Sequence, residues 1–140
     1  FSSSRVCCNS SRCSFNSSFW YNKVAISPAN ANPENNVAEI VRKHCSRIAF
    51  AHIRNVKHFE NGDFSEASHR DCDGDTGILD ILKAYHDCGY EGYIRPDHGR
   101  HLWDEKPGNV RPGYGLYDRA LGIMYMLGVW DTLDRQKLIK

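Results

Sequence analysis

Hydrophobic residues recur every three or four positions in three stretches of the chain, and this spacing predicts three helices. We expect them at about 33–45, at 76–88 and from 116 towards the C-terminus. Gly122 and Gly128 fall within the last helix and would permit close packing there. The hydrophobic stripe of that helix consists of Leu116, Ala120, Ile123, Leu127 and Trp130.

Two runs with a different pattern predict buried strands. Residues 48–53 are continuously apolar apart from His52, which is typical of a strand covered on both faces of a parallel sheet. Residues 92–94 end a second strand, because Pro96 lacks the N–H that a sheet requires. A residual strand and loop is expected at 24–30. Strands that alternate with helices predict an α/β fold with a parallel sheet.

The two ends of the first helix and the end of the second carry their own signals. Asn32 is a suitable N-cap, Pro33 suits the first helical turn, and Gly89 ends the second helix.

The polar stretch 55–75 predicts a long functional loop, in which Glu66 and His69 are candidate functional residues. Its aspartates have the spacing of a calcium-binding loop, but the glycine and the final glutamate of such a loop are missing. We therefore expect these aspartates to form turns and a helix cap. They are Asp71, Asp73 and Asp75.

Composition narrows the class of protein. The chain has 140 residues, a net charge of +1 and 25% charged residues, which predicts neither a nucleic-acid partner nor a membrane partner. Residues 1–30 form a Ser-rich, irregular head, and residues 31–140 are expected to form the fold. Three of the six cysteines lie in the head, and the other three are sparsely spaced, which favours reduced thiols, a core position for Cys45 and a cytoplasmic location.

Candidate chemistry gathers at 94–100, which reads IRPDHGR. Asp97 and His98 follow directly after a strand, and His52 lies near the end of the other strand. If these strands are parallel neighbours, His52 and Asp97 emerge at one edge and are able to share a divalent ion of the manganese, iron or zinc kind. The alternatives are a structural hydrogen bond for His52 and a turn for Asp97.

Arginines near this edge indicate an acidic substrate. Arg54, Arg95 and Arg100 carry planar guanidinium groups that bind carboxylates through two parallel hydrogen bonds. Each of them is equally suited to an ion pair with an acidic neighbour on the protein.

Longer motifs resemble one family. The sequences FAHIRNV at 50–56, FSEASH at 64–69, YIRPDHGRHLW at 93–103 and RPGYGLYDRALG at 111–122 closely resemble the C-terminal part of bacterial mannonate dehydratase. The likeness covers about 31–135. It implies the C-terminal portion of a TIM (β/α)8 barrel of the xylose-isomerase-like kind, incomplete here because a whole barrel takes about 250 residues.

The resemblance also implies roles for individual residues. It makes His52 and Asp97 ligands of Mn²⁺ or Fe²⁺, and His98 and Tyr114 the proton-transfer groups. The family converts D-mannonate to 2-dehydro-3-deoxy-D-gluconate and water in glucuronate catabolism. The small-molecule substrate would be D-mannonate, and the full-length enzyme would be a candidate homo-oligomer.

Two departures from the family pattern concern the metal site. Residues 26–30 contain no cysteine where the family places a ligand, and the head contains no histidine for a further ligand. We therefore expect the isolated chain to bind metal poorly and to be inactive. The alternative functions are another metal-dependent sugar isomerase or epimerase of the same barrel type, and a fragment without catalytic activity.

Overall fold

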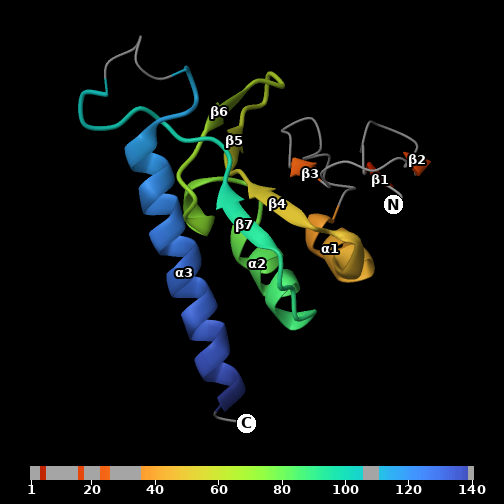
Figure 1. Cartoon of the computed structure of the whole chain (residues 1–140). Helices are drawn as coiled ribbons and strands as arrows, with labels where there is room; N and C mark the ends of the chain where they lie inside the picture. The colour runs from red at the N-terminus through yellow and green to blue at the C-terminus, as the bar shows by residue number, and fades with distance from the viewer. Residues whose placement is uncertain (1–3, 6–15, 18–22, 26–35, 106–110, 139–140) are drawn as a thin grey trace.

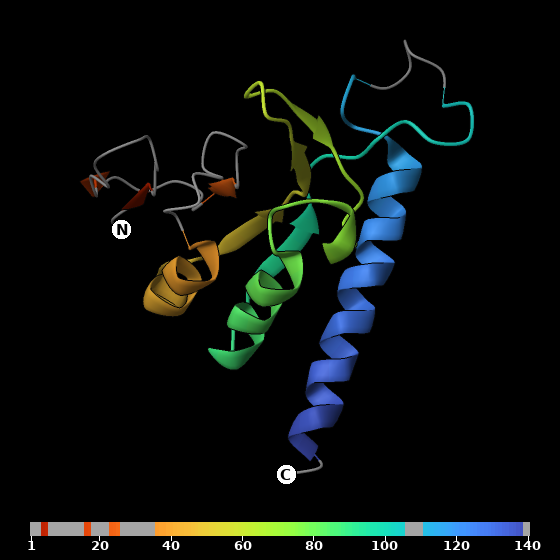
Figure 2. The same cartoon turned by 180° about the vertical axis from the view of Figure 1, so that it is seen from behind.

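A parallel three-stranded sheet forms the centre of the computed structural model, and α1 and α2 lie against one of its faces (Figures 1 and 2). The structure describes residues 4–5, 16–17, 23–25, 36–105 and 111–138. The strands, in sheet order, are β3 (Lys23–Ala25), β4 (Phe50–Ile53) and β7 (Tyr93–Pro96). The helices are α1 (Val37–His44), α2 (Ile78–Asp87) and α3 (Leu116–Leu138), and α3 packs along α2 and β7. The predicted alternation of helices and parallel strands is confirmed.

The first helix begins at Val37, where Asn36 acts as its N-cap. The Asn36 side chain accepts a hydrogen bond of 3.1 Å from the backbone N–H of Glu39, which satisfies a donor that the helix leaves unpaired. The expected cap, Asn32, and the expected first residue, Pro33, lie outside the described residues.

The core lies between the sheet and the two shorter helices. Side chains of β4 and α2 dominate it, because Ala51 and Ile53 of β4 and one face of α2 are fully buried. Gly89 has a φ of 66°, a left-handed conformation that favours glycine, and α2 ends before it as predicted. The most deeply buried apolar residues are Val41, Ala51, Ile53, Ile78, Ile81, Leu82, Ala84 and Tyr85.

The orientation of α3 differs from the prediction. Leu116, Ile123 and Leu127 belong to the predicted stripe, but they are 59%, 45% and 52% exposed. The buried positions are Asp118, Gly122 and Met126, which lie on another face of the helix. A Cβ atom on Gly122 would lie 2.5 Å from His69 Nδ1, so the glycine permits close packing as expected, whereas nothing lies within 4 Å of a Cβ on Gly128.

The predicted loop at 55–75 contains regular structure. An antiparallel hairpin of β5 (Val56–His58) and β6 (Phe64–Glu66) is followed by the 3-10 helix η3 (Asp71–Asp73). The strands are too short and too polar for the periodicity to reveal them. The expected capping role is confirmed for Asp71, because its Oδ1 accepts a 2.8 Å hydrogen bond from the N–H of Leu79 in the first turn of α2.

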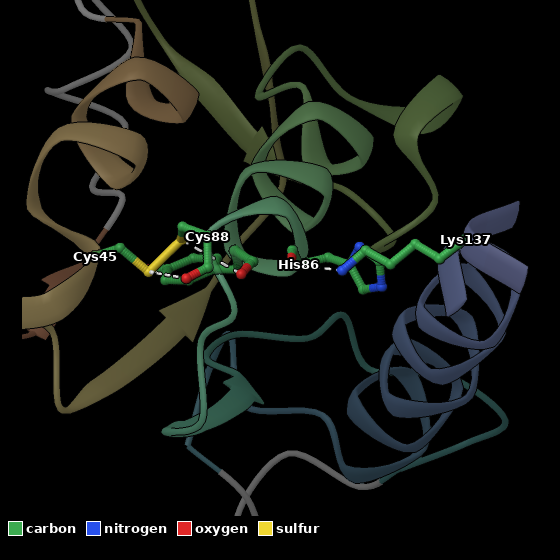
Figure 3. The surroundings of a disulfide bond; sticks show 5 residues. Cys45, His86, Cys88 and Lys137 are labelled. Carbon is green, nitrogen blue, oxygen red and sulfur yellow. Dashed lines mark hydrogen bonds between the residues drawn. A yellow bond between two sulfur atoms is a disulfide. The ribbon is translucent and has the colours of Figure 1, made fainter. Parts of the chain in front are cut away.

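A disulfide joins the end of α1 to the end of α2 (Figure 3). Cys45 and Cys88 are 43 residues apart in the sequence, and their Cα atoms are 6.5 Å apart. The expectation of reduced thiols is therefore wrong for this pair. Cys45 forms a cross-link to α2 and is not only a core residue. Cys72 is an exposed free cysteine. On the other side of α2, Lys137 Nζ of α3 donates a 3.4 Å hydrogen bond to the His86 carbonyl (Figure 3).

The remaining short elements complete the described structure. They are the antiparallel strands β1 (Ser4–Arg5) and β2 (Asn16–Ser17), and the 3-10 helix η2 (Cys45–Arg47). In the described part of the chain, we find no helix with the length and apolar character that a membrane span requires.

The two faces of the sheet have different surroundings. Ala51 and Ile53 of β4 point to the helices and are fully buried, and Ile94 of β7 packs with them. Since side chains alternate along a strand, the neighbouring residues point to the opposite face. Tyr93 is 79% exposed on that face, and no helix of the described residues covers it. The residues of this uncovered face are Phe50, His52, Tyr93 and Arg95.

Candidate active site

The carboxyl ends of β4 and β7 bring an imidazole and a carboxylate together. The two strands are parallel and pair Ile53 with Pro96, so the residues at their ends lie side by side. The Asp97 N–H donates a 2.8 Å hydrogen bond to the Ile53 carbonyl and extends this register. His52 Nδ1 then lies 3.0 Å from Asp97 Oδ1, and both side chains are about nine-tenths buried. The predicted convergence of His52 and Asp97 is confirmed.

His98 and Tyr114 lie next to this pair. Their rings are 4.5 Å apart between centroids and inclined by 36°. Two backbone hydrogen bonds of 2.9 Å, from Gly99 to Gly113 and from Gly115 to Gly99, hold the two segments parallel. The structure therefore brings the two predicted proton-transfer residues into contact, although 15 residues lie between them in the sequence.

Glu66 is the third group at His98. Its Oε1 atom lies 3.1 Å from His98 Nδ1, and Asp97 Oδ2 lies 3.7 Å from His98 Nε2. The His98 Nδ1 atom is buried, and the described residues provide it with no aligned hydrogen bond. The distance to Glu66 is thus that of an ion pair without the angle of a hydrogen bond. His98 has a carboxylate near each of its ring nitrogens.

The three predicted substrate-binding arginines have different surroundings. Arg54 donates two hydrogen bonds to Glu66, one from Nε at 3.0 Å and one from Nη2. Arg100 binds the buried Asp118 in the same way, at 2.9 and 3.1 Å, and this pairing raises the pKa of Arg100. Arg95 is exposed on the uncovered face of the sheet, where its register partner is His52.

His69 supports the strand end from the helix side. It is 2% exposed, and its Nε2 donates a 3.1 Å hydrogen bond to the carbonyl of Ile53. Burial lowers the pKa of His69, since the charged form would lose its hydration, while the Ile53 carbonyl and Asp118 oppose this effect. Neutral His69 therefore holds the backbone at Ile53, between His52 and Arg54, in place.

Sequence reasoning missed the role of Asp118. This residue is 1% exposed, and besides the Arg100 side chain it also accepts a 2.7 Å hydrogen bond from the Arg100 N–H. The available signal was a charged residue within the first turn of the last helix, on a face other than the predicted stripe. Such a residue reads as a solvent-exposed one until the orientation of α3 is known.

His52 Nδ1 and Asp97 Oδ1 form a hydrogen bond in this structure, and their spacing also suits two ligands of one cation. Bonds of about 2.1 Å at right angles place neighbouring ligand atoms roughly 3 Å apart, which agrees with the 3.0 Å between Nδ1 and Oδ1. Among the residues that the structure describes, no group of three or more His, Cys, Asp or Glu side chains is arranged to hold a metal ion. A complete coordination sphere therefore needs donors from outside these residues.

Fold and site together define an α/β protein with acid, base and guanidinium groups at the carboxyl edge of a parallel sheet. Residues 19–140 match the family model described as D-mannonate dehydratase (UxuA), and the chain belongs to this family.

Individual relatives agree with this assignment. Mannonate dehydratase 1 of Bacillus licheniformis is 63% identical over 107 residues, which are 76% of this chain and 28% of the relative. Mannonate dehydratase 1 of Halalkalibacterium halodurans is 61% identical over 104 residues, 74% of this chain and 28% of the relative. The crystal structure of mannonate dehydratase from Streptococcus suis serotype 2 matches with a TM-score of 0.69 and 35% identity, over 78% of this chain and 31% of that chain. The chain thus spans less than a third of the length of these relatives.

Proposed function

We propose that this chain carries the closing part of the active site of a mannonate dehydratase, the hydro-lyase that removes water from D-mannonate. The observation that carries the proposal is the convergence of His52 and Asp97 at 3.0 Å beside the His98 and Tyr114 rings. Strand ends of parallel sheets are where α/β enzymes place their catalytic groups. The family match over residues 19–140 supports this reading of the four side chains.

We propose that residues 31–140 form the C-terminal portion of a TIM barrel of the xylose-isomerase-like kind. Two features support it: the strands are parallel with helices on one face, and Tyr93 and Arg95 on the other face are exposed. In a complete barrel that other face points inwards and is covered by the remaining strands. β3 at 23–25 lies before this range, within the stretch expected to be an irregular head, and adds a third parallel strand to the sheet.

His52 and Asp97 would hold Mn²⁺ or Fe²⁺ together with donors from outside the described residues. Imidazole and carboxylate ligands suit such ions. A bound divalent cation would supply stabilisation for negative charge that develops beside the substrate carboxylate.

The chain's own residues would move the protons. Dehydration requires a base that takes the proton from C2 and an acid that gives a proton to the departing C3 hydroxyl. His98 and Tyr114 lie in ring contact, so one substrate position brings both groups within reach. We propose that these two residues divide the tasks, in either order.

A positive charge at the sheet edge would orient the substrate carboxylate. Arg95 is exposed on the uncovered face beside His52, so its guanidinium group is available to a ligand there. Arg54 and Arg100 remain proposed substrate-binding residues, and each of them already holds a carboxylate of the protein.

The proposal also includes a cytoplasmic location, where sugar-acid catabolism takes place. The Cys45–Cys88 bond would then be exposed to the reducing thiols of that compartment.

A chimera tests the proposed function. Residues 31–135 of this chain replace the corresponding segment of the Bacillus licheniformis relative, and dehydration of D-mannonate is measured with Mn²⁺ present. We expect a folded, active chimera whose activity falls at least a hundredfold in His52→Ala and Asp97→Ala. His58→Ala is the matched control, since His58 lies on β5 and faces Asp75. A folded chimera that does not dehydrate mannonate, or one that keeps its activity without His52, would contradict the proposal.

A further inference from the structure

Glu66 connects a guanidinium group to an imidazole at the candidate active site. Its Oε2 atom accepts the 3.0 Å hydrogen bond from Arg54 Nε, and its Oε1 atom faces both Arg54 Nη2 and His98 Nδ1. The three side chains are 13%, 18% and 19% exposed, in the order Arg54, Glu66 and His98. A charged chain of this kind, largely shielded from water, has stronger interactions than surface ion pairs.

The backbone presents Glu66 rigidly. It is the last residue of β6 and pairs in register with Val56 of β5, and the next residue, Ala67, donates a 3.1 Å hydrogen bond to the Asn55 carbonyl. Arg54 is also held from a second side, because its guanidinium carbon lies 5.3 Å from the centre of the Phe64 ring. Glu66 thus has a fixed place between strand β4 and His98.

The surroundings of His98 leave its Nδ1 atom to Glu66. This atom is buried and has no hydrogen-bond partner in the described structure, and Glu66 Oε1, 3.1 Å away, is the carboxylate oxygen that lies nearest to it among the ion pairs of His98. Gly113 has a φ of 78° and borders the contact, since a Cβ atom there would lie 3.2 Å from His98 Nδ1 and 3.8 Å from Glu66 Oε1. The competing contact, from Nε2 to Asp97 Oδ2, is longer at 3.7 Å.

We propose that Glu66 is a positioning residue that keeps the proton of neutral His98 on Nδ1, and that Arg54 holds Glu66 in place for this purpose. With the proton on Nδ1, beside the negative charge of Glu66 3.1 Å away, the lone pair of Nε2 is the one available for proton transfer. An imidazole oriented by a carboxylate in this way is a recurring arrangement at catalytic histidines. The inference rests on the proposed function only in giving His98 a catalytic role.

The tautomer of His98 is measurable without activity. Long-range ¹H–¹⁵N correlation spectra of the histidine-labelled chain show which ring nitrogen carries the proton, and His98→Asn identifies the His98 signals. We expect Nδ1–H in the unmodified chain at neutral pH. In Glu66→Ala the proton is expected to move to Nε2, whereas Glu66→Gln, which keeps an acceptor oxygen, should retain Nδ1–H.

Glu60→Ala is the matched control, because Glu60 is an exposed glutamate at the tip of the same hairpin. It should leave the His98 signals unchanged. A protonated Nε2 in the unmodified chain would overturn the proposal without any variant, so a failure of Glu66→Ala to fold does not remove the test. An unchanged tautomer in a folded Glu66→Ala chain would overturn it as well.

The chimera separates this inference from the proposed function. There, Glu66→Ala should lower kcat roughly tenfold to a hundredfold with little change in KM, because the tautomer of His98 changes while the substrate contacts remain, and Glu66→Gln, which retains Nδ1–H, should keep more of the activity. If the chimera has no dehydratase activity but the spectra show Nδ1–H that depends on Glu66, the proposed function fails and the positioning role stands. If kcat and KM of the active chimera do not respond to Glu66→Ala, the positioning role in catalysis is wrong.

Discussion

Gly122 and His69 show how single residues decide the packing at the candidate site. The helix α3 approaches the sheet edge at Gly122, where a side chain would overlap with the His69 ring. His69 in turn binds the Ile53 carbonyl, the same oxygen that accepts the N–H of Asp97. One glycine on α3 therefore contributes to the position of both strand ends that carry His52 and Asp97.

Gly122→Ala is expected to destabilise the chain by about 1–3 kcal/mol, because the new Cβ atom forces the buried His69 ring to move. Urea unfolding measures the difference. Gly128→Ala on the same helix is the matched control, since nothing lies within 4 Å of its Cβ position. That exchange should stabilise the helix by about 0.5–1 kcal/mol. Equal effects of the two exchanges would show that the His69 contact carries no packing constraint.

The protonation of His69 links stability to pH. Burial lowers the pKa of His69 in the folded chain, so the unfolded chain binds a proton first as the pH falls below about 6.5. The contribution of neutral His69 is complete above that pH and decreases as the pH falls towards the folded-state pKa. We expect the free energy of unfolding to fall more between pH 7.5 and pH 5.5 in the unmodified chain than in His69→Gln. A parallel decrease in both proteins would contradict this prediction.

Candidate residues were largely predictable at this scale, and their partners were not. The sequence places His52 and Asp97 at the ends of two apolar runs, and parallel strands bring such ends to one edge. The ion pairs of Arg54 with Glu66 and of Arg100 with Asp118 join segments 12 and 18 residues apart. Each arginine was expected to bind either a substrate or a protein carboxylate, and only the positions of β6 and α3 decide which protein carboxylate lies within reach.

At the scale of elements, the disulfide is the feature that links α1 to α2. Both cysteines are half-buried at the ends of their helices, where the two helices pack against each other. The bond closes a loop that contains β4 and the β5–β6 hairpin, and this loop carries His52 and Glu66 of the candidate site. The spacing of cysteines in the sequence does not predict this pairing, because it depends on the packing of the two helices.

The double exchange Cys45→Ser and Cys88→Ser should lower the free energy of unfolding by about 2–4 kcal/mol. The reason is that a bond between residues 43 apart restricts the unfolded chain, and its loss restores that chain entropy. Thermal unfolding with and without dithiothreitol measures the same quantity in the unmodified chain. Cys72→Ser serves as the control, since Cys72 is free and exposed. Two results together would show that the cross-link is absent in solution. Dithiothreitol would leave the melting temperature unchanged, and the thiols of Cys45 and Cys88 would react with a thiol reagent as that of Cys72 does.

At the scale of the whole molecule, the candidate site is open on one side. The sheet face with His52 and Arg95 has no covering helix among the described residues, and the chain spans 28% of the length of its Bacillus licheniformis relative. The described residues offer two converging metal donors, His52 and Asp97, and no group of three. The proposed dehydratase activity therefore depends on further donors and on cover for this face.

The isolated chain is expected to bind Mn²⁺ weakly and to dehydrate D-mannonate at no measurable rate, since two protein ligands hold a divalent ion poorly. Equilibrium dialysis with Mn²⁺ and an assay of the 2-dehydro-3-deoxy product check both statements. Stoichiometric Mn²⁺ that survives dialysis, together with turnover that is lost in Asp97→Ala, would show that the described donors are joined by others of this chain.

Local patterns in the sequence determined the helices, the two apolar strands and the arrival of His52 and Asp97 at one sheet edge, because periodicity and strand ends depend on neighbouring residues. Only the tertiary structure decided that α3 buries Gly122 rather than the Leu116 stripe, that Cys45 joins Cys88, and that Glu66 lies between Arg54 and His98. These contacts depend on how elements distant in the sequence are oriented, and that orientation is set by packing over the whole core.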